Sequence, residues 1–367
     1  MADMVLESRR ISPEATIRIQ GRRIGPGYPV YVIAELSANH HQQFEQAVLL
    51  IKAAKDAGAD AVKLQTYTPD TITIQSSRKE FRIQAGTIWD GRSLYDLYGE
   101  AFTPWEWHSA LKEVANRLDM DLFSSPFDET AVDFLERMKV PAYKVASFEL
   151  VDLPLIQRMA RTGKPLIIST GMATAEEIDE ALAAARQAGA RDIALLKCTS
   201  SYPSPAEDMN LRVIPELSTR FGLPVGLSDH TVGIAAPVAA VALGACILEK
   251  HITLSRATPG PDSAFSLEPQ EFKAMVEAVR TTEKALGEAR LGPSAKEESS
   301  RVFRRSLFVV ESIKRGEEFT THNVRSIRPA NGLHTRHLRQ VLGQRAACDI
   351  ERGTPLSWSL LEGGSLS

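Results

Sequence analysis

The strongest constraint on the fold of this chain is a regular alternation of short apolar runs with longer helical patterns. The runs, rich in β-branched and aromatic residues, predict eight strands. They are residues 31–36, 61–67, 121–127, 143–148, 165–170, 193–199, 224–229 and 247–253. Segments such as FEQAVLLIKAAKDAG lie between them, with apolar residues recurring every three or four positions. The pattern predicts eight successive βα units.

Eight such units favour a closed barrel over an open, doubly wound sheet, because near-continuous apolar strands separated by helices indicate a covered parallel sheet. A dinucleotide-binding sheet would need a glycine-rich turn after its first strand. The segment there, SANHHQQF, contains no glycine. We therefore predict an α/β fold whose main domain, residues 29–286, is a (βα)₈ TIM barrel.

The barrel is expected to have an extension at each end. Residues 1–28 predict an N-terminal extension and a β-hairpin that can plug the barrel bottom, because ATIRIQGRRIGPGYP alternates and contains Gly and Pro turns. The polar segment 287–301 is typical of a linker. Beyond it, SIKRGEEFT and DIERGTPLS repeat one pattern, which predicts a small β-rich domain over 302–367 with internal pseudo-symmetry.

Composition excludes several classes of function. The net charge is −3, with 43 basic and 46 acidic residues mixed along the chain, so neither a nucleic-acid-binding stripe nor a polybasic membrane anchor is expected. The cysteines Cys198, Cys246 and Cys348 lack CxxC spacing and predict reduced thiols. No apolar segment is long enough for a membrane span, and MADMVLESRR does not resemble a secretion signal, so a cytoplasmic protein is expected.

Polar residues end all eight predicted strands, and in a (βα)₈ barrel the chemistry gathers at these carboxyl ends. The residues are Glu35, Asn39 and His40; Lys63 and Gln65; Ser124 and Ser125; Lys144, Ser147 and Glu149; Ser169 and Thr170; Lys197, Thr199 and Tyr202; Ser228, Asp229 and His230; and Glu249 and His251. Lysines with hydroxyl groups suit a phosphate or carboxylate. Lys63 and Lys144 are the better candidates, since Lys197 equally suits a structural ion pair.

Two histidines predict a metal site. His230 and His251 end neighbouring strands, and a pair of imidazoles with open positions suits Mn²⁺, Fe²⁺, Co²⁺ or Zn²⁺ acting as a Lewis acid on a carbonyl. A single buried histidine is more often a core residue with satisfied hydrogen bonds, but the pairing favours the metal. His40 could border the pocket, whereas His41 and His108 equally suit a solvated loop or helix face.

These motifs resemble the sialic acid synthase family of phosphoenolpyruvate-condensing enzymes. The similarity runs from about residue 16 to 361 through IAELSANH, ADAVKLQTYTPDT, FSSPFD, YKVASFE, STGMAT, KCTSSYP, GLSDHTVG and EKHIT. It implies a (βα)₈ barrel followed by a small antifreeze-like (SAF) domain, in a domain-swapped homodimer. Within the family, TIWDGRSLYDLYGEAFTPWEWHSAL is similar to the pseudaminic acid branch. Phe148 stands where the neuraminate branch has glycine, which suits a 6-deoxy sugar and an apolar wall.

The resemblance implies that phosphoenolpyruvate condenses with an open-chain N-acetylated amino sugar to give a nonulosonic acid and phosphate. Glu149 and Glu35, with Lys63 and Lys144, would be catalytic, and Glu149 would handle the proton of the attacking water. The remaining implied roles are phosphoenolpyruvate binding by Lys63, Ser125, Lys144, Ser147, Ser169 and Ser228, sugar binding by Gln65, Tyr202, Asp262 and Arg328 (in IRPANG, reaching across the dimer), and metal binding by His230 and His251. Mn²⁺ is the expected ion, with Mg²⁺ and Co²⁺ as alternatives.

Other functions stay open at this point. An N-acetylneuraminate or legionaminate synthase would use the same mechanism on a different sugar. A phosphosugar aldolase or epimerase could use the same barrel, because fold alone does not fix the reaction. A carbohydrate-binding protein with the SAF domain as its active module is disfavoured by the polar groups at all eight strand ends.

Overall fold

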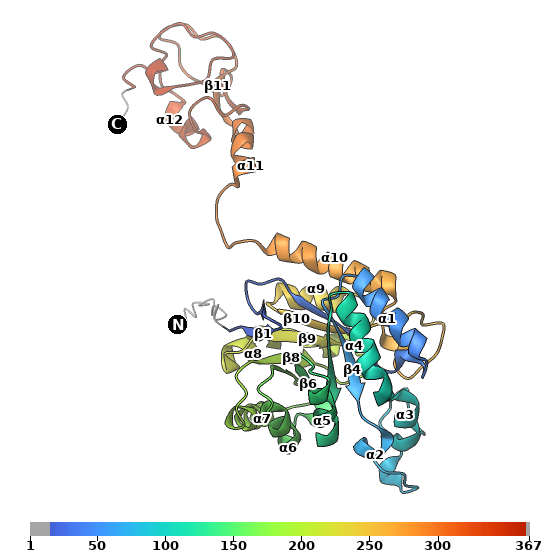
Figure 1. Ribbon diagram of the computed structural model, residues 1–367. Helices are drawn as coiled ribbons and strands as arrows, with labels where there is room; N and C mark the ends of the chain where they lie inside the picture. The colour runs from blue at the N-terminus through green and yellow to red at the C-terminus, as the bar shows by residue number, and fades with distance from the viewer. Residues whose placement is uncertain (1–14, 365–367) are drawn as a thin grey trace. The chain divides into compact units, whose positions relative to one another are not determined.

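The computed structural model describes residues 15–364, so residues 1–14 of the predicted extension and 365–367 of the predicted C-terminal domain lie outside the described residues. The chain divides into two compact units that join between Gly287 and Glu288 (Figure 1). Within the described range, no helix is both long and apolar enough to cross a membrane.

The first unit is a closed barrel of eight parallel strands in sequential order, in which the last strand pairs with the first. The predicted (βα)₈ barrel is thereby confirmed. The strands are β3 (Tyr31–Glu35), β4 (Ala61–Thr66), β5 (Asp121–Pro126), β6 (Tyr143–Val145), β7 (Leu166–Ser169), β8 (Ile193–Cys198), β9 (Val225–Asp229) and β10 (Ile247–His251). Every strand of the barrel lies inside one of the predicted runs. Gly226 lies where β9 and β10 are close together, since a Cβ atom there would come within 2.3 Å of the Ile247 carbonyl oxygen.

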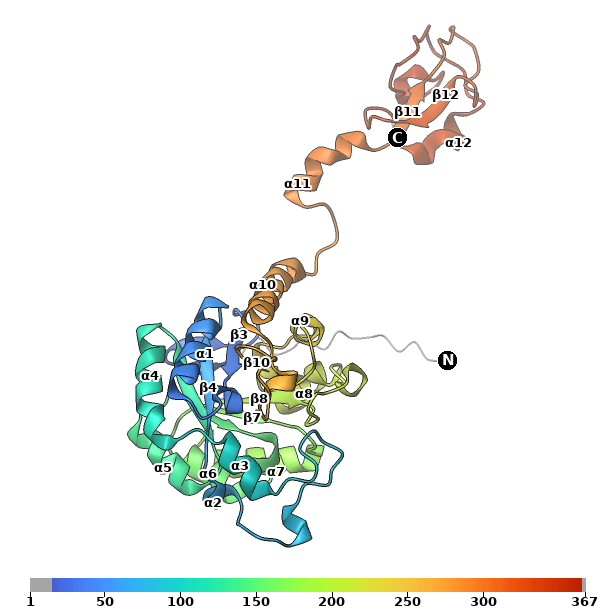
Figure 2. The same cartoon turned by 90° about the vertical axis from the view of Figure 1, so that its right-hand side faces the viewer.

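Helices cover the outside of the barrel, as Figures 1 and 2 show. They are α1 (Phe44–Asp56), α4 (His108–Arg117), α5 (Glu129–Arg137), α6 (Leu153–Ala160), α7 (Ala175–Gln187), α8 (Val213–Phe221), α9 (Ala235–Ala242) and α10 (Pro269–Leu286). Each buries an apolar stripe against the strands. Helix α7 begins with a capping box, in which the side chains of Thr174 and Glu177 satisfy each other's backbone N–H groups.

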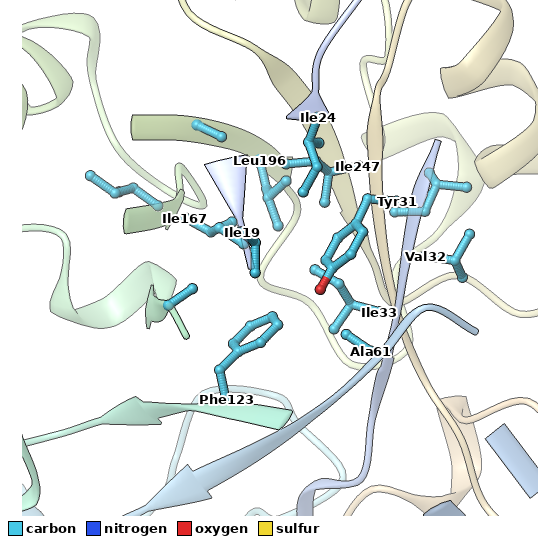
Figure 3. Packing of buried hydrophobic residues seen from close by; sticks show 14 of the residues in the cluster. Ile19, Ile24, Tyr31, Val32, Ile33, Ala61, Phe123, Ile167, Leu196 and Ile247 are labelled. Atoms are coloured by element: carbon cyan, nitrogen blue, oxygen red, sulfur yellow. The ribbon is translucent and has the colours of Figure 1, made fainter. Parts of the chain in front are cut away.

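A hairpin closes the amino end of the barrel. Strands β1 (Ile17–Ile19) and β2 (Arg22–Ile24) pair antiparallel, and Ile17, Ile19 and Ile24 are at most 1% exposed. Figure 3 shows Ile19 and Ile24 beside Tyr31 and Ile247, the first residues of β3 and β10. Burial of these isoleucines stabilises the closed end through the hydrophobic effect.

A long segment follows β4 at the opposite end of the barrel. It contains α2 (Pro69–Ile72), the 3₁₀ helix η2 (Lys79–Phe81) and α3 (Leu94–Ala101) (Figures 1 and 2). Periodicity did not predict these elements, because they are short and lie outside the regular βα pattern. They form one wall of the cavity described below.

The second unit has its own small core around β11 (Ser306–Val309) and β12 (Val324–Ile327). The two sequence repeats pair with each other, since Ile313 and Ile350 exchange backbone hydrogen bonds of 2.9 and 2.8 Å. The structure also places α11 (Ala295–Glu298) and η7 (Ser299–Phe303) in and just beyond the segment predicted as a linker, so part of that segment is helical. The short helix α12 (Leu338–Val341) completes the unit.

Candidate active site

A cavity of about 490 Å³ opens at the carboxyl ends of the barrel strands. The predicted residues that line it are Lys63, Gln65, Lys144, Ser147, Glu149, Ser169, Tyr202, Ser228, His230, His251 and Asp262. Glu35 and Ser125 are fully buried beside Lys63 and are not part of the lining. Arg328 belongs to the second unit and is exposed there.

Lys63, Lys144 and Glu249 form the cavity floor, and the buried Glu35 pairs with Lys63. The Nζ atom of Lys63 lies 2.7 Å from Glu35 Oε2 and 3.5 Å from Glu249 Oε1. Lys144 lies 3.9 Å from the other oxygen of Glu249 and donates a 2.6 Å hydrogen bond to Ser169. Glu249 therefore lies between the two ammonium groups. Lys63 also donates to Ser125 over 3.4 Å.

Burial and ion pairing act differently on the two carboxyls that pair with these lysines, Glu35 and Glu249. Burial raises the pKa of Glu35, an effect that Lys63 only partly offsets. Burial acts the same way on Glu249, but Lys144 and Lys63 outweigh it and lower the pKa of that carboxyl. For Lys63, Glu249 and Glu35 overcome the burial penalty and raise the pKa, so the ammonium stays charged. The floor thus presents hydroxyl groups around a charged lysine, which suits a multiply charged anion.

Glu149 stands above the floor at the end of β6. Strand β6 stops at Val145, and the chain turns into η4 (Ser147–Glu149), which places both Ser147 and Glu149 at the cavity. Ser147 Oγ accepts a 3.2 Å hydrogen bond from the Gly171 N–H. In the part of the chain that the structure describes, Oε2 of Glu149 is buried without a hydrogen-bond partner. Burial raises the pKa of Glu149 to about 7.

A polar chain crosses from the first strand to the loop after the last. The Gln65 amide donates to Glu35 and to Ser37, each over 3.0 Å. Ser37 in turn donates to the half-buried carboxylate of Asp262. Ser37 has a left-handed backbone at φ 43°, which is uncommon for a residue with a side chain. These groups offer both donors and acceptors to a polyhydroxylated ligand.

The two predicted metal ligands lie side by side. The imidazole centroids of His230 and His251 are 5.3 Å apart. His230 Nδ1 is 3.1 Å from the Thr199 carbonyl oxygen, so a proton on Nδ1 donates there and Nε2 keeps its lone pair. Nδ1 of His251 is buried and has no partner among the described residues. Burial, reinforced by His230, holds the pKa of His251 well below its usual value.

This pair fits a divalent ion that keeps open positions for water or substrate. It does not fit a closed structural site, since residues 15–364 contain no group of three or more His, Cys, Asp or Glu side chains arranged to hold a metal. The unpartnered nitrogen of His251 is the observation that favours a ligand here, because buried polar atoms in folded proteins are nearly always satisfied.

Other predicted candidates lie elsewhere. Lys197 donates to the Cys198 carbonyl and to Thr199 and does not line the cavity, so its role is structural. His40 does not border the pocket either, because it is fully buried against Thr103. His108 is not solvated: it is buried on α4.

Sequence reasoning missed several residues of the site. Glu249 was noted at a strand end without a role, although its position two residues before His251 puts both side chains on the same, inner face of β10. Cys198 lines the cavity, and its Sγ lies 3.9 Å from His230 Nδ1. Trp89 and Phe265 also line the cavity from loops, where no periodic signal identifies them.

Comparison with known proteins places this architecture in a family. The NeuB family profile matches residues 50–290, and the SAF domain profile matches residues 304–362. The chain is 47% identical over 331 residues to the pseudaminic acid synthase of Helicobacter pylori, covering 90% of this chain and 97% of the relative. It is 49% identical over 327 residues to the pseudaminic acid synthase of Campylobacter jejuni serotype O:2, with 89% and 95% covered.

A solved structure shows the same fold. The N-acetylneuraminic acid synthetase of Leptospira borgpetersenii is 32% identical, with a TM-score of 0.70 over 78% of this chain and 94% of that one. The resemblance read from the strand-end motifs is thereby confirmed. With a barrel whose eight strands end in the predicted residues and profile matches across both units, this chain belongs to the NeuB family.

Proposed function

We propose that this protein is a pseudaminic acid synthase. It condenses phosphoenolpyruvate (PEP) with the open-chain aldehyde of 2,4-diacetamido-2,4,6-trideoxy-L-altrose and water, giving pseudaminic acid and phosphate. The observation that carries the proposal is the near-full-length similarity to two pseudaminic acid synthases, at 47% and 49% identity. The cavity supports it, since two buried lysines, several hydroxyl groups, a polar chain and a histidine pair lie together there.

The floor binds PEP. Lys63 and Lys144, with Ser125, Ser147, Ser169 and Ser228, hold its phosphate and carboxylate through charge-assisted hydrogen bonds. Both lysines are almost fully buried, so their attraction for the anion is weakly screened by water. Glu249 offsets the repulsion between the two ammonium groups, since it pairs with both.

The sugar lies above PEP. Gln65, Tyr202 and Asp262 contact its hydroxyl and acetamido groups, and Glu35 fixes Gln65 through a 3.0 Å hydrogen bond. His230 and His251 hold a divalent ion, for which we propose Mn²⁺, with Mg²⁺ and Co²⁺ as alternatives. When bound, this ion polarises the aldehyde carbonyl. The histidines thereby set the position of the electrophilic carbon relative to the PEP floor.

The reaction forms one carbon–carbon bond and one carbon–oxygen bond from water, breaks one carbon–oxygen bond of PEP, and leaves a proton from the water on the former aldehyde oxygen. Carbon 3 of PEP attacks the aldehyde carbon, and water adds to the cation left at carbon 2 of PEP. Glu149, in its ionised form, takes the proton of that water. The tetrahedral adduct expels phosphate through cleavage of the bond between carbon 2 and the phosphate oxygen, and Lys63 stabilises the departing charge.

We also propose a domain-swapped homodimer in which Arg328 of the partner subunit contacts the sugar. Large apolar side chains are exposed on loops that follow strands β4, β6, β7 and β9, and such a rim favours a protein partner over the barrel mouth. These residues are Ile74, Ile88, Phe148, Val151, Met172 and Val232, each at least 50% exposed. The proposed location is the cytoplasm, in keeping with three free cysteine thiols.

Phosphate release from PEP tests the function. The assay compares 2,4-diacetamido-2,4,6-trideoxy-L-altrose, N-acetylmannosamine and the legionaminic acid precursor, each with Mn²⁺ and with a chelator. Chelator-sensitive release with the altrose at far higher kcat/KM is expected. Preferential release with either other sugar would assign the protein to the neuraminate or legionaminate branch. Covalent trapping of the altrose by borohydride would instead indicate a Schiff-base aldolase.

A further inference from the structure

The segment between β4 and α4 supplies most of the apolar surface of the cavity. From this segment the lining includes Tyr67, Ile72, Ile83, Thr87, Trp89, Leu94, Leu97, Tyr98 and Ala101. The floor, in contrast, is built from charged and hydroxyl side chains of the strands. The cavity therefore has a polar end, where the reacting groups are held, and an apolar wall formed by one segment of the chain.

Within this wall, residues 83–92 form a loop that is braced by its own hydrogen bonds. The Ile83 N–H donates to the Arg92 carbonyl, and the Gly91 N–H donates to the Ile83 carbonyl, both over 2.9 Å. The Asp90 carboxylate accepts the N–H groups of Ala85, Gly86 and Thr87 and the Thr87 hydroxyl. The loop thus holds its shape without a bound ligand.

Trp89 connects this loop to the opposite side of the cavity mouth. Its indole N–H donates a 2.9 Å hydrogen bond to the carbonyl of Pro261, the residue before Asp262. Its ring lies 5.4 Å, centroid to centroid, from Tyr202, which lies 4.5 Å from the His230 imidazole. A row of three rings therefore leads from the histidine pair to Trp89.

At the Trp89 end of this row, the side-chain hydrogen-bond donors of the loop that line the cavity are already engaged. The Trp89 N–H bonds Pro261, and the Thr87 hydroxyl bonds Asp90. A ligand hydroxyl placed against the indole would lose its hydrogen bonds to water and would find no free donor of the loop to replace them. Such a hydroxyl therefore disfavours binding. A methyl group at the same place gains from burial.

The chemistry of the sugar fits this row. Its aldehyde and its C6 methyl are at opposite ends of the carbon chain, so with the aldehyde at the histidines the methyl end extends along the rings. We propose that Trp89 is a specificity-determining residue, which the 83–92 loop holds beside Tyr202. It favours the 6-deoxy end of the sugar and disfavours a sugar with a C6 hydroxyl. This inference rests on the proposed function.

The test compares two sugars that differ by one oxygen atom, 2,4-diacetamido-2,4,6-trideoxy-L-altrose and its 6-hydroxy counterpart. Phosphate release gives kcat/KM for each. Wild-type enzyme is expected to prefer the 6-deoxy sugar by about 100-fold, the discrimination that an apolar pocket achieves against an added hydroxyl. Trp89→Ala is expected to reduce the preference below about tenfold, mainly through KM, whereas Trp89→Phe, which keeps an apolar ring, retains most of it.

Gln84→Ala is the matched control, because Gln84 lies in the same loop, is exposed and does not line the cavity. It should keep the wild-type preference. Calorimetric titration of Trp89→Ala with PEP checks that the floor is intact. An unchanged preference in Trp89→Ala, or equal kcat/KM for both sugars in the wild type, would overturn this inference and leave the proposed function intact. Phosphate release with neither altrose, but with N-acetylmannosamine, would contradict the proposed function and the inference with it.

Discussion

Glu149 has the properties required of a residue that handles a proton at neutral pH. It lines the cavity, one carboxylate oxygen is buried without a partner among the described residues, and burial raises its pKa to about 7. A pKa near the working pH keeps a useful fraction ionised while leaving the carboxylate basic enough to accept a proton. The other acids of the site are engaged: Glu35 with Lys63 and Gln65, and Glu249 with both lysines.

The first prediction concerns activity against pH. Because ionised Glu149 is the proposed base, kcat/KM should fall by about tenfold per pH unit below about pH 7. Glu149→Gln should lower kcat by about 10²- to 10⁴-fold. Steady-state phosphate release between pH 5 and 9 checks both. A wild-type profile that is flat across neutral pH would assign the proton transfer to another group.

The raised pKa of Glu149 also predicts that its ionisation lowers the free energy of unfolding. Its folded pKa of about 7 lies above the ordinary 4.5, so the folded state favours the protonated form. That stabilisation is complete below pH 4.5 and is lost as the pH rises through about 7. Glu149→Gln should therefore be more stable than wild type by about 3 kcal/mol at pH 8.5, with little difference at pH 5. Chemical denaturation at both pH values measures this, and a pH-independent difference would contradict it.

At the scale of the elements, the strands were predictable and the long connection was not. All eight barrel strands follow from short apolar runs, because a strand covered on both faces shows its burial directly in the sequence. β6 ends earlier than its run, since Ala146 begins the turn that presents Ser147 and Glu149. The elements α2, η2 and α3 depend on tertiary contacts, such as the Trp89 bond to Pro261, that no local pattern encodes.

The candidate site divides in the same way. Residues at strand ends, such as Lys63, Lys144 and His251, could be found because topology brings all carboxyl ends of the strands together. Ser37 and Trp89 could not be found in this way, since neither a left-handed turn nor a loop contact produces a repeating pattern in the sequence. Arg328 remains a prediction from the family resemblance alone.

A prediction at this scale concerns the hairpin formed by β1 and β2. Ile19 is fully buried against the barrel interior, so Ile19→Ala should lower the free energy of unfolding by about 3 kcal/mol. Both KM values should stay unchanged, because the cavity is at the other end. Urea denaturation measures the loss, and Leu49→Ala, on α1 at a site that is 45% exposed, serves as the control. A loss below about 0.5 kcal/mol would contradict a plug that is part of the core.

At the scale of the whole molecule, the two units have separate cores, and Arg328 belongs to the second. The proposed homodimer predicts a light-scattering mass of twice the 40.3 kDa chain. Arg328→Ala should lower kcat/KM for the sugar by about 10- to 100-fold, because a charged hydrogen bond is lost. Arg339→Ala, another exposed arginine of the same unit, should have no such effect.

Mixing two impaired variants distinguishes an active site shared between subunits from a site built by one subunit alone. In a dimer of Glu149→Gln with Arg328→Ala, one barrel keeps Glu149 and meets an intact Arg328 of the partner subunit. Activity should therefore return on mixing after subunit exchange. If the mixture is no more active than its components, or if light scattering gives the mass of a single chain, the proposed arrangement is wrong.

The hairpin at the amino end of the barrel also determines the order in which the two substrates bind. With that end sealed by isoleucines, both substrates and both products share the opening at the carboxyl ends of the strands, and in the proposed arrangement PEP binds on the floor below the sugar. A sugar that binds first would block the access of PEP to the floor. Binding should therefore be ordered, with PEP first, and raising the sugar concentration at low PEP should slow the enzyme, so that its throughput depends on the balance of the two supplies.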